Sequence, residues 1–232
     1  MKTTDFAKFS EELKAGAIIT VNKDLNWTSF DVVKKIKRLF RLPKVGHAGT
    51  LDPKATGLLV IATGIKTKEI DTYMNLEKEY SGKIHLGAET ESFDTETEII
   101  SEKNVDHLTE AELIKATRLF VGEIQQIPPM HSAVKLGGTP LYRLARAGEV
   151  IEREPRKVTI SEFSITDISL PYVSFKVICS KGTYIRSLAA DYGKALGVGA
   201  YLKELARVRI GNFKIEDSYK ISELEAISRS LK

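Results

Sequence analysis

The sequence predicts one mixed α+β domain, with a sheet of mostly antiparallel strands flanked by helices. Segments with the two-residue period of strands and segments with the spacing of helices follow one another in no regular order. A doubly wound parallel sheet would require a stricter alternation, so we favour a mixed sheet. The 232 residues, 42% of them hydrophobic, suffice for one domain with a substantial core, and no internal repeat divides them.

The first expected elements surround a short glycine-rich segment. Residues 15–21 (AGAIITV) are apolar and β-branched, which predicts a strand. Residues 28–40 (TSFDVVKKIKRLF) have helical spacing, either of the first two can cap the helix, and Pro43 closes it. Residues 58–62 (LLVIA) predict a buried strand. The segment between this helix and this strand is therefore expected to be a loop on a rigid support.

The remaining elements complete a single domain over residues 1–232. A helix is expected over 108–124, where Thr109 and Glu112 can form a capping box. Pro, Gly and basic residues over about 125–150 indicate an insertion that leaves the core. The other expected elements are a strand over 79–88, a loop or edge over 89–98, strands over 157–170 and 173–180, a helix over 183–196 and a short helical tail over 221–232.

Composition excludes several classes of protein. A single cysteine, Cys179, rules out an internal disulfide and a cysteine-based metal centre, which favours a reducing compartment. The first sixteen residues lack the apolar run of a signal peptide, and no later window approaches a membrane span. We therefore expect a cytoplasmic protein.

The charge is distributed unevenly along the chain. Residues 1–80 and 131–232 carry net charges of +4 and +6, whereas residues 81–130 carry −6. Two basic segments around an acidic one are expected if one face follows a polyphosphate. Ordinary solvated faces of a soluble protein would give the same pattern, so charge alone does not decide between these readings.

The segment VGHAGTLDPKATGLL, residues 45–59, holds the first candidate for chemistry. Pro53 restricts the residue before it to extended geometry, which gives the Asp52 side chain a defined direction. Gly46, Gly49 and Gly57 leave room for a ligand to approach the backbone. The pattern favours a carboxylate that acts on a bulky ligand, although Asp-Pro is also a common way to open a turn.

Other chemistries fit this segment less well. Its glycines match neither the GxxxxGK[ST] nor the GxGxxG order of phosphate-binding loops. A glycosidase pair would need a second positioned carboxylate, for which Asp94 and Asp191 are available. A Ser-His-Asp triad is possible in composition, but the sequence contains no GxSxG nucleophile elbow.

A second candidate lies in CSKGTYIRSLAADYG, residues 179–193. A strand is expected to end here and a helix to begin, with Tyr184 and Arg186 near its first turn. Arginine and aromatic side chains beside a helix N-terminus suit a carboxylate or a phosphate. An arginine at the start of a helix is also common on ordinary surfaces.

Together these segments resemble the TruB family, the tRNA pseudouridine-55 synthases. GHAGTLDPKATGLL is similar to the catalytic motif of the family, and CSKGTYIRSLAADYGKALG is similar to its arginine motif. Three further segments match in the same order: GAIITVNKDLNWTSFDVVKKIKRLF, EKEYSGKIHLGAETESFD and IPPMHSAVKLGGTPLYRLARAGE. The resemblance implies the pseudouridine synthase fold, with an RNA-facing insertion.

The resemblance also implies roles for single residues. Asp52 corresponds to the catalytic aspartate, Arg186 to the arginine that pairs with it, and Tyr80 to the tyrosine that stacks on the target base. The substrate-binding residues implied in the same way are His47, Lys68, Asp94 and Tyr184, to which the basic residues of the insertion, Lys135, Arg143 and Arg146, are added.

The implied reaction breaks and re-forms a glycosidic bond without redox change or hydrolysis, so we expect no cofactor and no metal. The expected partner is tRNA, through its T-arm and T-loop, and we expect a monomer that does not bind membranes. After residues 207–211 only the helical tail remains, so no full PUA-type RNA-binding domain is expected. A non-catalytic tRNA-binding or tRNA-folding module on the same fold is the alternative.

Overall fold

A computed structural model of the chain describes residues 5–132, 135–149 and 151–231. It forms two compact units. Unit 1 contains the residues up to Tyr80 and those from Leu205 onward, and unit 2 contains Ser81–Glu204. Unit 2 is therefore inserted into the sequence of unit 1, and the strands β4 (Lys78–Leu86) and β12 (Ala200–Ile210) run from one unit into the other. A single catalytic domain over 1–232 stays a prediction.

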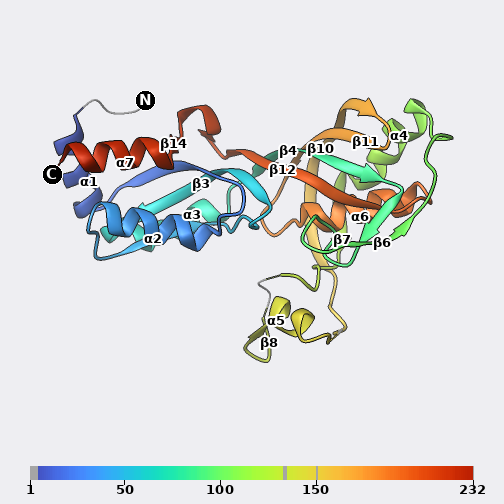
Figure 1. Ribbon diagram of the computed structural model, residues 1–232, viewed down its shortest axis with the longest axis horizontal. Coiled ribbons are helices and arrows are strands. Elements are labelled where there is room, and N and C mark those ends of the chain that lie inside the picture. The colour runs from blue at the N-terminus through green and yellow to red at the C-terminus, as the bar shows by residue number, and fades with distance from the viewer. Residues whose placement is uncertain (1–4, 133–134, 150, 232) are drawn as a thin grey trace. The chain divides into compact units, whose positions relative to one another are not determined.

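Unit 1 contains strands of a ten-stranded sheet and the helices packed on them (Figure 1). Strand β3 pairs with β1 and β2 in antiparallel fashion and with β12 in parallel, and β1 also pairs with β14. The elements of this unit, besides its parts of β4 and β12, are α1 (Phe6–Ala15), β1 (Ile18–Lys23), α2 (Ser29–Leu39), β2 (Val45–Ala48), β3 (Ala55–Thr63), η1 (Gly64–Glu69), α3 (Ile70–Met74), β13 (Phe213–Lys214), η3 (Ile215–Asp217), β14 (Tyr219–Lys220) and α7 (Ile221–Ser230).

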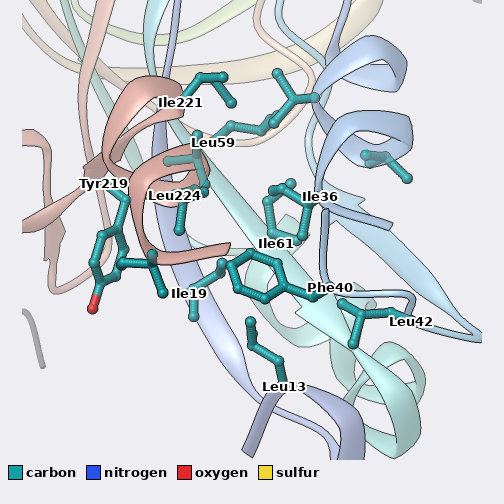
Figure 2. Packing of buried hydrophobic residues seen from close by; sticks show 14 of the residues in the cluster. Leu13, Ile19, Ile36, Phe40, Leu42, Leu59, Ile61, Tyr219, Ile221 and Leu224 are labelled. Carbon is teal, nitrogen blue, oxygen red and sulfur yellow. The ribbon is translucent and has the colours of Figure 1, made fainter. Parts of the chain in front are cut away.

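The core of unit 1 draws on both ends of the chain. Figure 2 shows Ile36 and Phe40, from α2 and its end, facing Ile61 of β3, while Leu224 of α7 closes the cluster. Tyr219 packs its ring against the same cluster and turns its hydroxyl away (Figure 2). The helical spacing predicted for 28–40 is thus confirmed, because the apolar side of α2 is the side that is buried.

Unit 2 contains a second antiparallel arrangement. Strand β10 pairs with β11 on one side and with β7 on the other, and β5 pairs with β6. Its elements, besides its parts of β4 and β12, are β5 (Ala88–Thr90), β6 (Ile99–Glu102), α4 (Glu110–Thr117), η2 (Arg118–Phe120), β7 (Gly122–Gln126), β8 (Lys135–Leu136), β9 (Thr139–Pro140), α5 (Leu141–Arg146), β10 (Arg156–Ser169), β11 (Tyr172–Cys179) and α6 (Ile185–Ala195). The predicted mixed α+β class with mostly antiparallel pairing is confirmed.

The insertion is a small hairpin followed by a helix. β8 and β9 pair across a turn in which Gly137 and Gly138 both have positive φ, and α5 follows directly. Two glycines with positive φ give the turn that matches the twist of a two-stranded hairpin. Figure 1 shows α5 and β8 (yellow) joined to unit 2 by two connecting segments.

The helix predicted over 108–124 is shorter in the structure. The helix expected over 108–124 begins as predicted, with the Thr109–Glu112 capping box formed, but α4 ends at Thr117. Gly122 has a φ of 105°, and the chain continues from it as β7. A positive φ is incompatible with a helix, and β-branched residues around the glycine favour a strand. The segment expected to be a loop before residues 58–62 contains the strand β2, and neither the helix α1 nor the strand β12 was predicted.

In the part of the chain that the structure describes, no helix combines the length and the apolar character needed to cross a bilayer.

Candidate active site

Asp52 lies in a tight turn of unit 1 between β2 and β3. The main-chain N–H of Ala55 donates to the carbonyl oxygen of Asp52 (3.0 Å), which places Pro53 at the second position of the turn. The carbonyl oxygen of Pro53 accepts a hydrogen bond from the N–H of Asn26 (2.8 Å). The Asp52 side chain is half-buried. The residue after Asp52 is therefore fixed by a hydrogen bond to Asn26, which agrees with the defined geometry that Pro53 predicts.

The entry side of the turn is held by Ser29, the first residue of α2. The N–H of Leu51 donates to the Ser29 hydroxyl oxygen (2.9 Å), and that hydroxyl lies 3.2 Å from the carbonyl oxygen of Leu51, to which it donates. Both Ser29 and Leu51 are buried. The residue immediately before Asp52 thus has both main-chain polar groups engaged by one side chain.

A buried arginine of β12 reaches the same loop. Arg207 donates from Nη2 to the carbonyl of Gly49 (3.0 Å), from Nε to that of Leu58 (2.8 Å), and from Nη1 toward that of Thr50 (3.5 Å). Only 1% of Arg207 is exposed. Carbonyl oxygens before and after Asp52 are therefore bound by one guanidinium group.

Lys23 adds a second buried cation near Asp52. Its ammonium group donates to the carbonyls of Trp27 (2.7 Å) and Asp24 (3.1 Å), and the side chain is fully buried. Burial lowers the pKa of Lys23 to about 8, while the negative charge of Asp52 acts in the opposite direction. Because this attraction is mutual, Lys23 favours the ionised carboxylate of Asp52.

His47 lies on β2, opposite Ile61 of β3. Burial, and secondarily the positive charge of Arg207, lower the pKa of His47, so its imidazole is neutral at pH 7. Its Nδ1 atom is buried and has no hydrogen-bond partner within the described residues. The ring therefore offers an uncharged, partly exposed surface beside the loop.

Two of the glycines have another role than the sequence suggested. A Cβ atom at Gly57 would lie 2.4 Å from the carbonyl oxygen of Arg207, because β3 and β12 pair at this position. A Cβ atom at Gly46 would lie 2.5 Å from Cδ1 of Ile70. The prediction that these glycines make room for a ligand is wrong, since the protein itself fills the space.

Tyr80 lies on β4 and is 8% exposed. The first residues of this strand are clamped by Arg209, which donates to Glu79 (2.8 Å), to Glu77 (3.0 Å) and to the carbonyl of Gly211 (3.1 Å). Lys68 is exposed at the end of η1. Arginines of β12 thus bind the main chain on both sides of Asp52 and the carboxylate of Glu79, the residue before Tyr80.

Unit 2 brings together two of the predicted residues, Asp94 and Arg186. Nε of Arg186 lies 3.6 Å from Oδ2 of Asp94, and the two residues are 3% and 4% exposed. Arg186 also donates to the carbonyls of His131 (2.7 Å) and Ser92 (3.2 Å). The other carboxylate oxygen of Asp94 accepts hydrogen bonds from the Ser92 hydroxyl and the Glu96 N–H (2.6 and 2.8 Å). Carbonyl oxygens therefore hold the guanidinium of Arg186, and a fixed carboxylate lies beside it.

Tyr184 precedes α6 and is anchored through its main chain. Its N–H donates to Oε1 of Gln126 (2.7 Å), and Nε2 of Gln126 donates to its carbonyl (3.0 Å). The hydroxyl of Ser187 donates to the carbonyl of Ile127 (2.9 Å). The end of β7 thus fixes the start of the helix that carries Arg186, while the Tyr184 ring stays half-buried.

The insertion residues are only partly placed. Arg143 is exposed on α5. Lys135 lies on β8 and Arg146 ends α5, but their side chains lie outside what the structure describes.

Among residues 5–132, 135–149 and 151–231, no three His, Cys, Asp or Glu side chains gather closely enough to hold a metal ion. A carboxylate supported by buried cations is suited to nucleophilic or proton-transfer chemistry on a cationic or electrophilic centre.

Two protein-family models together match residues 37–231, which include these residues. A model of the TruB family pseudouridylate synthase N-terminal domain matches residues 37–185, which include Asp52, Tyr80 and Asp94. A model of the tRNA pseudouridylate synthase B C-terminal domain matches residues 186–231, from Arg186 through the arginines of β12. The chain belongs to the TruB family.

Relatives of the TruB family match nearly the whole chain. A protein of Flavobacterium johnsoniae named tRNA pseudouridine synthase B is 48% identical, over 93% of this chain and 97% of its own length. One of Chlorobaculum tepidum with the same name is 49% identical, over 94% of this chain and 92% of its own. One of Clostridium tetani, also so named, is 49% identical, over 89% of this chain and 72% of its own.

Solved structures show the same fold. The chain matches a protein in the crystal structure of a Cbf5-Nop10-Gar1 complex with a TM-score of 0.72 and 29% identity. It also matches a protein in the structure of an H/ACA RNP bound to a substrate RNA, with a TM-score of 0.70 and 28% identity. The matches cover 98% and 97% of this chain, and 65% and 59% of those longer chains.

Proposed function

We propose that this TruB-family chain isomerises a uridine in the T-loop of tRNA to pseudouridine, with Asp52 as the group that engages the reacting nucleotide. The N1–C1′ glycosidic bond breaks, the uracil turns, and C5 bonds to C1′. The C5 proton leaves and N1 gains a proton, so atoms and charge balance without a co-substrate.

The observation that carries the proposal is that hydrogen bonds fix the turn containing Asp52 on both sides. Within the region that matches the family, this carboxylate lies between Leu51, held by Ser29, and Pro53, held by Asn26. Attack on C1′, attack on C6 and removal of the C2′ proton all require an ionised carboxylate in a fixed position. The rigid turn and the nearby Lys23 supply both properties.

Other residues act on the base. A uridine must leave its stack before a carboxylate can reach it, which costs a few kcal/mol. Stacking on the ring of Tyr80 returns roughly 1–3 kcal/mol of this cost. His47, which is neutral at pH 7, occupies the vacated space without adding charge. Arg186 pairs with the Asp52 carboxylate, as the resemblance to the family implies, and Asp94 and Tyr184 line the pocket of the base.

Binding to tRNA relies on phosphate contacts and on the shape of the T-arm. The basic residues of 34–44, Lys68 and the cations of the insertion, Lys135, Arg143 and Arg146, are proposed to contact phosphates. The folded T-loop is recognised by shape more than by base edges. We propose that the chain acts as a monomer in the cytoplasm, without metal or cofactor.

The proposal is tested with unmodified tRNA transcripts and nucleoside analysis of the T-loop. We expect pseudouridine at one T-loop uridine with the wild type, and none with Asp52→Asn, whose tRNA affinity should match that of the wild type. Lys157→Gln is the control for the effects of expression and purification. It changes an exposed residue that is paired with Glu123, and it should keep full activity. Free uracil would indicate a hydrolase, and binding without any product would indicate a non-catalytic module.

A further inference from the structure

Arg207 is an unusual residue for the interior of a strand. Its side chain is almost fully buried, and its neighbours in unit 1 are main-chain oxygens of a loop more than a hundred residues away in sequence. Burying a guanidinium is costly, and an apolar side chain of similar size often stabilises a core as well or better. A role in packing alone therefore does not account for an arginine at this position.

The contacts of Arg207 surround Asp52 in sequence. Gly49 and Thr50 stand before Asp52, Leu58 stands after it, and all three contribute carbonyl oxygens to the same guanidinium. The main chain of Arg207 also pairs with Gly57. One residue thus joins the entry and the exit of the loop and fixes the distance between them.

The conformation of Gly49 depends on this contact. Gly49 has a φ of 83°, a left-handed conformation that directs its carbonyl oxygen to Nη2 of Arg207. A Cβ atom at Gly49 would lie 3.4 Å from Nη1 of Arg207. This distance is an ordinary contact, so a side chain at Gly49 would not clash with Arg207 but would strain the left-handed main chain whose carbonyl the arginine binds.

We propose that Arg207 is a positioning residue for Asp52. It does not touch the RNA, and its planar fork holds the loop so that the carboxylate stays in its reactive position. This inference rests on the proposed function. A lysine would present its donors from one nitrogen, whereas the guanidinium of Arg207 reaches three carbonyls from three nitrogens held in one plane.

The test uses the full chain, an unmodified tRNA transcript and three measurements: the single-turnover rate, the tRNA dissociation constant and the melting temperature. For Arg207→Lys we expect a rate lower by about tenfold to a hundredfold, since a shift of about 1 Å in a reacting group has such effects. The dissociation constant should stay within about twofold of the wild type, because no phosphate contact is lost.

A matched control separates positioning from stability. Ser228 is buried in unit 1, and its hydroxyl donates to the carbonyl of Leu39 (2.8 Å), so Ser228→Ala also loses a buried hydrogen bond to a main-chain oxygen. We expect Ser228→Ala to lower the melting temperature and to leave the single-turnover rate unchanged. If both variants lost rate in proportion to their melting temperatures, Arg207 would be structural only.

A second variant covers the case in which Arg207→Lys does not fold. Gly49→Ala alters the same contact from the loop side, and we expect the same loss of rate with unchanged tRNA affinity. The double variant should lose no more than the worse single variant, because both remove one interaction. A wild-type rate in folded Gly49→Ala or Arg207→Lys overturns the inference. A wild type that forms no pseudouridine overturns the proposed function instead.

Discussion

Among the side chains that the structure describes, each unit buries one arginine, and the two arginines have different surroundings. In unit 1, Arg207 binds carbonyl oxygens of the loop that carries Asp52, the carboxylate that is proposed to react. In unit 2, the acid Asp94 lies beside the guanidinium of Arg186. Both arginines donate to carbonyl oxygens, and Arg186 has in addition a carboxylate beside it.

The difference shows how charge can be divided between support and reaction. A support that binds main-chain oxygens does not compete for the carboxylate of Asp52. In unit 2 the carbonyls of Ser92 and His131 orient the guanidinium of Arg186, while Asp94, at 3.6 Å, places a negative charge beside it. A substitution of the support in unit 1 should therefore change the position of a loop, whereas one in unit 2 should change the charge around Arg186.

The largest effect is expected from Arg186. Arg186→Ala should lower the single-turnover rate by about a thousandfold, and Arg186→Lys should restore little of it, because lysine lacks the planar fork. The measurement is pseudouridine formation under single-turnover conditions. Arg156→Lys, at an exposed arginine of the same unit, is the control and should keep the wild-type rate.

Asp94→Asn tests how much the ion pair contributes to the function of Arg186. If Asp94 acts as the support, its loss leaves Arg186 charged and buried, and the rate should fall less than in Arg186→Ala while the protein is destabilised. Breaking a buried ion pair costs about 3–5 kcal/mol. Full stability of Asp94→Asn in urea unfolding would show that the pair at 3.6 Å contributes little.

The next effect concerns the buried Lys23 of unit 1. Its pKa is about 8 in the folded chain against 10.5 as the ordinary value. Below pH 8 the folded and unfolded chains both hold this proton. Between pH 8 and 10.5 the unfolded chain holds more protons, so Lys23 makes the free energy of unfolding rise with pH, by at most about 3 kcal/mol.

Lys23→Met lacks this contribution. We therefore expect the difference in unfolding free energy, wild type minus variant, to increase between pH 7.5 and 10.5. Urea unfolding at the two pH values measures it, with Lys54→Met, at an exposed lysine of the same unit, as the baseline. A difference that does not change with pH would mean that Lys23 has access to solvent.

A smaller effect is expected from Tyr80→Phe, which keeps the ring and removes the hydroxyl. If the hydroxyl assists the loss of the C5 proton, the variant should bind tRNA normally and react about tenfold more slowly. Single-turnover kinetics on tRNA with deuterium at C5 of the target uridine measure this step. A wild-type rate would leave Tyr80 with stacking alone, and Tyr80→Leu should then impair both binding and rate.

The smallest effect is expected from single surface cations. Arg143→Gln on the insertion and Lys34→Gln on α2 should each weaken tRNA binding a few-fold and lower the salt slope by about one unit. Lys115→Gln, at an exposed lysine of the acidic segment, is the matched control. Titration at several salt concentrations gives the slope, and unchanged slopes would place these residues away from the phosphates.

The sequence was most informative where side-chain chemistry and local pattern coincide. The Asp-Pro turn, the helix after Thr28 and the Thr109–Glu112 capping box all involve residues close together in sequence, and each is present. The ion pair of Asp94 and Arg186 joins two residues that the family resemblance had singled out.

Arg207, Lys23 and Gln126 were missed for a common reason. Their partners are main-chain carbonyl or amide groups, which every residue has, so no residue type marks them in the sequence. Long charged side chains are also rarely fully buried, which argues against placing Arg207 or Lys23 in a core. Residues 200–210 mix charged and apolar residues, and this concealed the strand β12.

Because unit 2 is inserted into the sequence of unit 1, unit 2 is complete before unit 1 when the chain is synthesised. Ribosomal synthesis proceeds at about 5–20 residues per second, and domains generally fold as they emerge. Unit 2 is complete when Glu204 has been added, whereas unit 1 still lacks Arg207 and the core residues Tyr219 and Leu224. During synthesis, Asp52 is therefore among the first quarter of the residues to appear, but its loop lacks the contacts of Arg207 until the whole of unit 2 has been made.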